Sequence, residues 1–327
     1  MNPNNRSLPR AASRLRLGRA AYLLWHKPLA VIARSRREGG PINQWINRRG
    51  RWAMVTAAQK LPPRPWPAPD APQVHFLTGK NFWYQTAFCC WSLCHHAGRE
   101  FTPVFIDDGT FDDGLRAEAT RLFPGTRFLA AAECEARLDA HLPLEKFPAL
   151  RGQRRNYIHL RKLTDAHAGH DGWRVVLDSD MIFFRRPDAL LAWLAAPGRP
   201  IHMLDVQNAY GYPEATLVAL AGRPLPERLN VGICGLRSDA IDWEKLEFWC
   251  ARLLAQHGTS YYLEQALCAL LLADSNPLRL PAADYLVMPT EPECRAPTAA
   301  LHHYVAESKR GYFRHAWRKA LADALAR

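Results

Sequence analysis

An acidic triplet stands between two apolar runs in Val175-Val176-Leu177-Asp178-Ser179-Asp180-Met181-Ile182-Phe183. Side chains alternate faces in an extended segment, so the carboxylates of Asp178 and Asp180 can converge at the exposed end of a strand that is buried on both sides. Two converging carboxylates suit Mg²⁺ or Mn²⁺, which keep open positions for water and phosphate oxygens. An acidic triplet on a solvated loop is the alternative, and the apolar runs on both sides favour the metal site.

The chain has 327 residues, of which 48% are hydrophobic, enough for one domain with a large core. Its formal charge of +12 is confined to one region. Residues 1–70 contain 14 Lys and Arg and only two acids, Glu38 and Asp70, whereas the rest of the chain has equal numbers of acidic and basic side chains. The basicity therefore belongs to an N-terminal appendage, and it does not indicate that the domain binds nucleic acid.

We divide the chain into a basic amphipathic arm at residues 1–60, a proline-rich linker at 61–72 and a folded domain at 73–327. His26-Lys27-Pro28 divides the apolar residues of the arm into two stretches. Each stretch is much shorter than the roughly 20 residues needed to cross a bilayer. Lys27, Pro28 and the lack of a small-residue cleavage site disfavour a signal peptide. The arm is expected to lie on an anionic membrane surface as a basic helix. A solvated arm, or one that packs on the domain, is the alternative, and nucleic acid is a less favoured partner.

The eight cysteines include no C-x-x-C pair, and this spacing disfavours structural zinc. Most of them lie in apolar surroundings, as Cys250 and Cys268 do. We predict reduced, mostly buried thiols in a cytoplasmic protein that is peripheral on the inner face of the membrane. Cys89, Cys90 and Cys94 form a cluster that is close enough in sequence to oxidise.

Strands and helices are expected to alternate from residue 73 onward. Strands are predicted at 74–79, 103–109 and 126–129, with helices at 81–97 and 112–122. This order is typical of an α/β fold with parallel strands, helices on both faces of the sheet, and ligands at the carboxyl ends of the strands. The residues that fall at such ends are Thr78, Gly79, Asp107, Asp108, Asp178 and Asp180.

A predicted helix at 154–168 leads into the strand that carries the acidic triplet. Its Arg154, Arg155, Arg161 and Lys162 are candidates for contacting phosphate, and a solvated helix face is the alternative for Arg154 and Arg155. Further helices are expected at 188–196, 243–257 and 261–273, and strands at 201–205 and 229–236. Glycines interrupt the last strand, which indicates a bulge or a close approach of ligand to backbone.

Taken in order, these motifs resemble the GT-A nucleotide-sugar glycosyltransferases, in particular the retaining family 8 type that includes glycogenin and bacterial lipopolysaccharide galactosyl- and glucosyltransferases. The resemblance spans residues 73 to about 315. The motifs that carry it are Leu177-Asp178-Ser179-Asp180-Met181-Ile182, Leu160-Arg161-Lys162-Leu163, Leu229-Asn230-Val231-Gly232, Glu264-Gln265, and Leu301-His302-His303-Tyr304 with Lys309. It implies a Rossmann-like GT-A domain with a mostly parallel central sheet flanked by helices.

The resemblance also implies roles for individual residues. Mn²⁺ or Mg²⁺ would be held by Asp178, Asp180 and a late histidine. The family has Gly two residues after that histidine and then Lys-Pro-Trp, whereas this chain lacks the Gly and has its lysine one residue later. The choice between His303 and His302, and the role of Lys309, therefore stay open. The remaining implied site residues are Thr78, Gly79 and Asp108 for base and ribose, Arg161, Lys162 and Lys309 for the donor, and Asn230, Glu264 and Gln265 for the transferred sugar.

The activity implied is metal-dependent transfer of a hexose from a nucleotide-diphosphate sugar to a glycan or glycolipid acceptor, with retention, in the synthesis of bacterial cell-surface polysaccharide. Acceptor contacts are expected from the loop at residues 207–228. A sugar nucleotidyltransferase is the first alternative, which the short, single-glycine segment Thr78-Gly79-Lys80-Asn81 disfavours. A degenerate GT-A domain that binds glycan or membrane is the second. The intact triplet argues against it, and the altered histidine region argues for it.

Overall fold

The structure is a computed structural model that describes residues 40–326. Its internal contacts divide the chain into two compact parts, one ending at Arg51 and one running from Trp52 onward. Helix α3 (Pro41–Ala58) crosses this boundary. Most of the predicted basic arm, residues 1–39, lies outside the described residues. Within residues 40–326, none of the helices combines the length and the apolar character needed to cross a bilayer.

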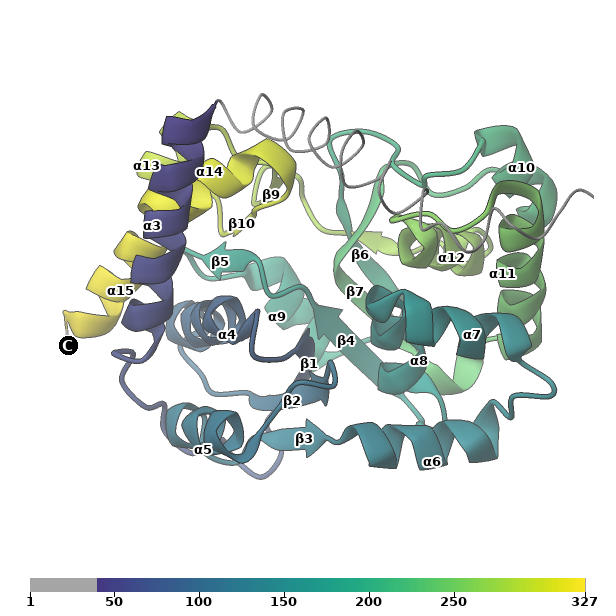
Figure 1. Ribbon diagram of the computed structural model, residues 1–327, viewed down its shortest axis with the longest axis horizontal. Coiled ribbons are helices and arrows are strands. Elements are labelled where there is room, and N and C mark those ends of the chain that lie inside the picture. Colours follow the sequence, from purple (N-terminus) through teal and green to yellow (C-terminus); the bar gives the residue numbers. More distant parts are fainter. Residues whose placement is uncertain (1–39, 327) are drawn as a thin grey trace, which may run out of the picture. The chain divides into compact units, whose positions relative to one another are not determined.

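A seven-stranded sheet forms the centre of the second part (Figure 1). Strands β1 to β4 pair in parallel, β6 and β8 pair in parallel, and β7 runs antiparallel to both of its neighbours. The α/β prediction with a mostly parallel sheet is thus confirmed. Across the sheet the strands are β3 (Arg127–Leu129), β2 (Thr102–Asp107), β1 (Gln73–Thr78), β4 (Trp173–Leu177), β7 (Leu229–Arg237), β6 (Ile201–Leu204) and β8 (Leu278–Arg279).

Most predicted helices occur within a few residues of their expected bounds. They are α4 (Trp83–Ala97), α5 (Asp113–Leu122), α9 (Asp188–Ala195), α11 (Trp243–His257) and α12 (Leu263–Leu272). The helix predicted at 154–168 is instead broken into α7 (Pro148–Asn156), a 3₁₀ turn at Ile158–Leu160, and α8 (Arg161–His167). The break falls at Tyr157, which has extended backbone angles of φ −130° and ψ 95°. Helices α6 (Ala131–His141), α10 (Glu214–Ala221), α13 (Glu291–Arg295), α14 (Lys309–Gly311) and α15 (Trp317–Leu325) had not been predicted.

A second, three-stranded sheet brings the end of the chain to the acidic triplet. It consists of β5 (Met181–Phe183), β10 (Leu301–His303) and β9 (Tyr285–Val287), with β10 in the middle. Strand β10 runs antiparallel to β5, and this register sets His303 opposite Met181. The Tyr304 N–H donates to the carbonyl of Asp180 at 2.9 Å, which extends the pairing by one residue. The pairing therefore fixes His303 beside the triplet.

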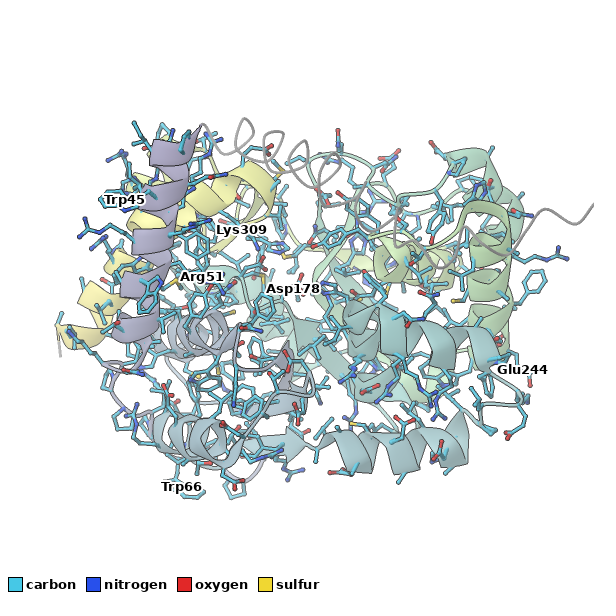
Figure 2. All side chains as sticks on the ribbon, viewed as in Figure 1. Trp45, Arg51, Trp66, Asp178, Glu244 and Lys309 are labelled. Carbon is cyan, nitrogen blue, oxygen red and sulfur yellow. The ribbon has the colours of Figure 1, made fainter. Side chains whose placement is uncertain are left out.

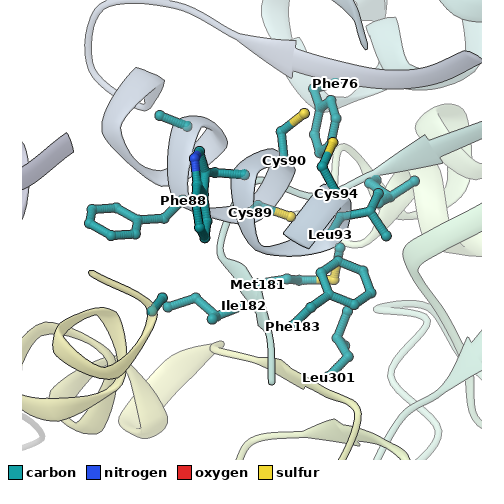
Figure 3. Close-up of a cluster of buried hydrophobic side chains, with 14 of the residues drawn as sticks. Phe76, Phe88, Cys89, Cys90, Leu93, Cys94, Met181, Ile182, Phe183 and Leu301 are labelled. Atoms are coloured by element: carbon teal, nitrogen blue, oxygen red, sulfur yellow. The ribbon is translucent and has the colours of Figure 1, made fainter. Parts of the chain in front are cut away.

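Helix α4 joins the two sheets through a shared core. Nearly all of its side chains are buried, the polar Gln85, Thr86 and Ser92 included. Figure 3 shows Phe88, Cys89 and Leu93 of this helix among residues from both sheets, Phe76 of β1 on one side and Phe183 of β5 on the other. All eight cysteines are buried with free thiols. Strands from both sheets are thus packed with this helix in one core.

The proline-rich segment at 61–72 is fastened to this core. The indole N–H of Trp91 donates to the carbonyl of Pro62 at 3.0 Å. The Arg64 N–H donates to the carbonyl of Leu122 at 2.8 Å, and its guanidinium pairs with Glu100, with Nε 3.2 Å from Oε2. At the end of α3, Met54, Ala57 and Ala58 belong to the same buried cluster. The predicted boundaries at residues 60 and 72 stay predictions.

The sequence suggested that Arg154 contacts phosphate, but in the structure this residue forms an internal ion pair. Its Nε and Nη2 donate to the two carboxylate oxygens of Asp165 at 2.6 and 2.9 Å, and its Nη1 donates to Glu135 at 2.6 Å. Burial opposes the charge, but the two carboxylates outweigh it and raise the pKa of Arg154. Because Arg154 and Asp165 are both buried, this bridge ties α7 to α8 and α6.

Arg154→Leu is expected to lower the free energy of unfolding by about 3–5 kcal/mol, because it leaves the Asp165 carboxylate buried without its partner. Arg155→Leu is the matched control, since Arg155 is next to it on the same helix and exposed. That control should change stability by less than about 0.5 kcal/mol. Urea denaturation measures both. Equal losses in the two variants would contradict a structural role for Arg154.

Candidate active site

The acidic triplet lies where β4 of the large sheet ends and β5 of the small sheet begins (Figures 1 and 2). The Asp178 N–H donates to the carbonyl of Gly232 in β7 at 2.7 Å, so the first carboxylate is anchored at the carboxyl end of β4. Asp180 is anchored through its carbonyl, which accepts from Tyr304. In an open α/β sheet this end of the strands is where ligands bind. The triplet therefore occupies the expected position.

Asp178, Asp180 and His303 each offer one ligand atom, and these atoms all lie within 4.8 Å of one another. The Nε2 atom of His303 is 3.6 Å from Asp178 Oδ2 and 3.3 Å from Asp180 Oδ1. The imidazole is 2% exposed, yet neither of its nitrogens has a hydrogen-bond partner within the described residues. An unsatisfied buried polar atom costs roughly 1–3 kcal/mol. The donor set and the unpartnered nitrogen fit a divalent cation.

The two candidate histidines are neighbours in β10, and their side chains point to opposite faces of this strand. Alternation along the strand turns His302 away from the triplet, where its Nδ1 lies 3.2 Å from the Tyr304 hydroxyl and its ring meets Phe184 edge-on at 5.0 Å. Burial lowers the pKa of His302 to about 4. Burial also disfavours charge on His303, but Asp180 and Asp178 outweigh it and raise the pKa of His303. Of the two histidines, it is His303 that shares the acidic cluster.

The asparagine-x-glycine motif of β7 makes room for this histidine. A Cβ atom on Gly232 would lie 2.5 Å from His303 Nδ1, so a side chain there is incompatible with the ring's position. The Gly232 N–H donates to Asn230 Oδ1 at 2.9 Å, and Asn230 Nδ2 donates to Asp205 Oδ2 at 2.9 Å. Asn230 is buried and is placed to act on the site through Gly232.

Lys162 is buried between two carboxylates. Its Nζ lies 2.6 Å from Asp178 Oδ1 and 3.0 Å from Glu264 Oε2. Burial opposes the ammonium charge, but both carboxylates together raise the pKa of Lys162. Burial raises the pKa of Glu264 to about 7, against the opposing effect of Lys162. The lysine thus ties α8 and α12 to the end of β4.

Lys309 holds the second carboxylate from the solvent side. Its Nζ is 3.1 Å from Asp180 Oδ2, and its side chain is 41% exposed. Burial works against ionisation of Asp180, but Lys309 and His303 outweigh it and hold the pKa of Asp180 well below its usual range. Around the triplet, Asp178, Asp180 and Glu264 thus face Lys162, Lys309 and His303, so three acidic side chains meet three basic ones.

The other strand-end candidates gather at β1 and β2. A Cβ atom on Gly79 would lie 2.0 Å from Asp108 Oδ1, so the glycine lets the two strand ends approach closely. Asp108 accepts from the Thr110 N–H at 2.9 Å, and Arg161 Nη1 donates to the carbonyl of Asp107 at 3.0 Å. Thr78 is buried, with its hydroxyl 2.7 Å from that of Thr86. Contacts of these residues with base and ribose stay a prediction.

Gln265 fixes the loop that follows β6. Its Nε2 donates to the carbonyl of Ala209 at 2.8 Å, within the segment predicted to bind the acceptor.

Sequence reasoning missed two features of the site. Asp205, which orients Asn230, stands at the carboxyl end of a predicted strand, and the criterion that singled out Asp107 would have found it. Tyr312 is buried, stacks on Tyr304 at 4.6 Å, and has a hydroxyl with no partner within the described residues. It begins a π-helical turn at Tyr312–Ala316, close after Lys309. Such turns are frequent at functional sites, but the sequence carried no sign of it.

A cavity of about 440 Å³ lies at the opposite, amino-terminal ends of β1 and β4, where it is lined by Gln73, His75, Trp173 and Arg174 among others. It does not reach the triplet. The cavity and the cluster of acidic and basic side chains are therefore in different places. We assign the active site to the side-chain cluster.

No protein-family model matches the sequence, and no curated protein matches it. Solved structures do match. The galactosyltransferase LgtC in complex with donor and acceptor sugar analogues matches over 76% of this chain and 95% of that chain, with 16% identity and a TM-score of 0.51. Mouse xyloside xylosyltransferase 1 matches over 71% and 97%, with 14% identity and a TM-score of 0.48. The bifunctional glycosyltransferase WbbM matches over 80% and 53%, with 13% identity and a TM-score of 0.47.

At 16% identity, the similarity to LgtC concerns the fold, and it agrees with the mostly parallel seven-stranded sheet and its flanking helices. The chain therefore has the GT-A fold that the order of its motifs predicted.

Proposed function

We propose that this protein is a metal-dependent glycosyltransferase that moves a hexose from a nucleotide-diphosphate sugar to a glycan or lipid-linked acceptor, with retention. One observation carries the proposal. On a GT-A fold, two carboxylates and a buried, unpartnered imidazole nitrogen converge at the carboxyl end of the central sheet. These three side chains suit a divalent cation as ligands. A nucleotide would bind at the strand ends around them.

Mn²⁺ or Mg²⁺, held by Asp178, Asp180 and His303, would supply positive charge where the diphosphate leaves. The chain's own residues divide the remaining work. Lys309 is 41% exposed, and in the proposal it exchanges its contact with Asp180 for a contact with phosphate oxygens. Lys162 was expected to contact the donor. Because its Nζ is buried between two carboxylates, we propose instead that it holds Asp178 and Glu264 in position.

The donor's base and ribose are assigned to the β1 and β2 ends, with Thr78, Gly79 and Asp108, and with Arg161 beside them. Asn230, Glu264 and Gln265 are assigned to the hydroxyls of the transferred sugar. Glu264 suits that role because a carboxyl with a pKa of about 7 both accepts and donates hydrogen bonds near neutral pH. Among residues 40–326, no side chain around the triplet stands out as a nucleophile.

The proposal also covers the acceptor and the place of action. We propose a role in bacterial cell-surface polysaccharide synthesis, on the cytoplasmic side of the membrane, with residues 73–327 as the catalytic domain. Residues 1–60 would provide the membrane contact and 61–72 the connection. The loop at 207–228 is the proposed acceptor region, and its anchoring to α12 through Gln265 supports this position.

Mn²⁺ should stabilise the protein against unfolding, by about 2.7 kcal/mol at 100 times its dissociation constant. His303→Gln is expected to lose most of that gain, because it removes the nitrogen that faces both carboxylates, whereas His302→Gln is expected to keep it. Thermal unfolding with and without MnCl₂ measures the gain for each variant relative to its own metal-free state, so any cost to folding cancels. A gain lost with His302→Gln and kept with His303→Gln would overturn the assignment.

Asp180→Asn should reduce Mn²⁺-dependent hydrolysis of the donor by about 100-fold or more, because it removes a charge that holds the cation at the diphosphate. A screen of UDP-, GDP- and CMP-sugars identifies the donor to be used. Asp188→Asn, which neutralises an exposed aspartate at the start of α9, serves as the control and should leave the rate unchanged. Unchanged turnover in Asp180→Asn would refute the proposed site.

Proton NMR of the first product formed should show the anomeric configuration of the donor sugar. The coupling constant of the anomeric proton distinguishes the two configurations before mutarotation. An inverted product would contradict retention and leave the metal site standing.

A further inference from the structure

Helix α3 (Pro41–Ala58) exposes large apolar side chains to solvent. Trp52 is 77% exposed, Ile42 74% and Trp45 56%, and Val55 is exposed as well. Single exposed apolar residues are common on protein surfaces, but several on one short helix indicate a surface that is covered by a partner.

The exposed side chains share one face of the helix. Ile42, Trp45, Arg49, Trp52 and Val55 recur every three or four residues, the spacing that aligns side chains along an α-helix. The buried Met54, Ala57 and Ala58 fall on a different side of the helix. The apolar face is therefore a stripe separate from the face that packs into the core.

This face is also basic. Residues 41–58 contain Arg48, Arg49 and Arg51, all exposed, and no Asp or Glu. The guanidinium of Arg49 lies 4.7 Å from the centre of the Trp45 ring, so cationic and aromatic groups are interleaved along the stripe. The partner must accept apolar side chains and carry negative charge.

An anionic lipid surface meets both requirements. Tryptophan favours the boundary between headgroups and acyl chains, where the ring is buried and the indole N–H stays near water. Each Arg near an anionic leaflet adds electrostatic attraction to the surface. A helix of 18 residues, about 27 Å long, can lie in the plane of that boundary. The phosphates of a nucleic acid would attract the arginines but would leave Ile42 and Val55 in water.

We propose that α3 docks on anionic membranes, with Trp45 and Trp52 inserted at the headgroup boundary and Arg48, Arg49 and Arg51 facing the headgroups. This goes beyond the transferase assignment and does not depend on it. It also narrows the membrane contact expected for residues 1–60 to one face of one helix. A transferase held in this way would work on acceptors that are themselves in the membrane.

Co-sedimentation of the full chain with vesicles tests the proposal. Vesicles of phosphatidylglycerol and phosphatidylcholine in equal parts should bind the protein at low salt, vesicles of phosphatidylcholine alone should bind it at least tenfold less, and added salt should weaken the binding. The affinity of the double variant Trp45→Gln with Trp52→Gln for the anionic vesicles should be lower by about tenfold or more. Trp66→Gln, which replaces a tryptophan that is also exposed but lies outside α3, should bind like the wild type.

Two results would overturn the proposal. Binding of the double variant equal to that of the wild type would place the lipid contact elsewhere in the chain. A wild-type dimer that becomes a monomer in the double variant, measured by light scattering, would show that a second copy covers this face.

Metal-dependent donor hydrolysis in solution should be the same in the double variant and the wild type. If the wild type binds vesicles but hydrolyses no nucleotide sugar, the proposed function fails and the membrane surface stands.

Discussion

Three carboxylates, those of Asp178, Asp180 and Glu264, repel one another in one partly buried region, and the rest of the site is arranged to hold them there. Lys162 is sealed between Asp178 and Glu264 and carries its charge despite burial. Lys309 holds Asp180 from the solvent side. Such an arrangement has little value for stability, because desolvating charges costs about as much as pairing them returns. A cation bound between Asp178, Asp180 and His303 would give these paired charges a function.

The fold supplies the positions. The chain leaves the large sheet after Asp178 and enters the small sheet after Asp180, so the triplet lies at the junction of the two sheets. Helix α4 is buried in the core that the two sheets share. Strand β10 then delivers His303 to the same point, and Gly232 leaves the space that its ring occupies. A change to any of these elements would move a ligand atom while leaving the sequence motif intact.

Much of this arrangement could be predicted from sequence because it depends on local patterns. The apolar strand before Asp178, the alternating strands and helices, and the glycines of β7 are all local. The pairing of β10 with β5 could not be predicted, since both strands have three residues and lie more than 100 residues apart. Only that pairing decides between His302 and His303. Arg154 appeared free for phosphate because nothing in the sequence reveals that Asp165 and Glu135 surround it.

Asp178, Asp180 and His303 are proposed to form one cation site on a GT-A fold. Anomalous diffraction from a crystal soaked in Mn²⁺ can locate the ion. A manganese peak is expected between the three side chains, bonded to at least one oxygen of each aspartate and to Nε2 of His303, with Lys309 moved from Asp180. A crystal that binds Mn²⁺ only elsewhere, with His303 and both lysines still around empty carboxylates, would contradict it.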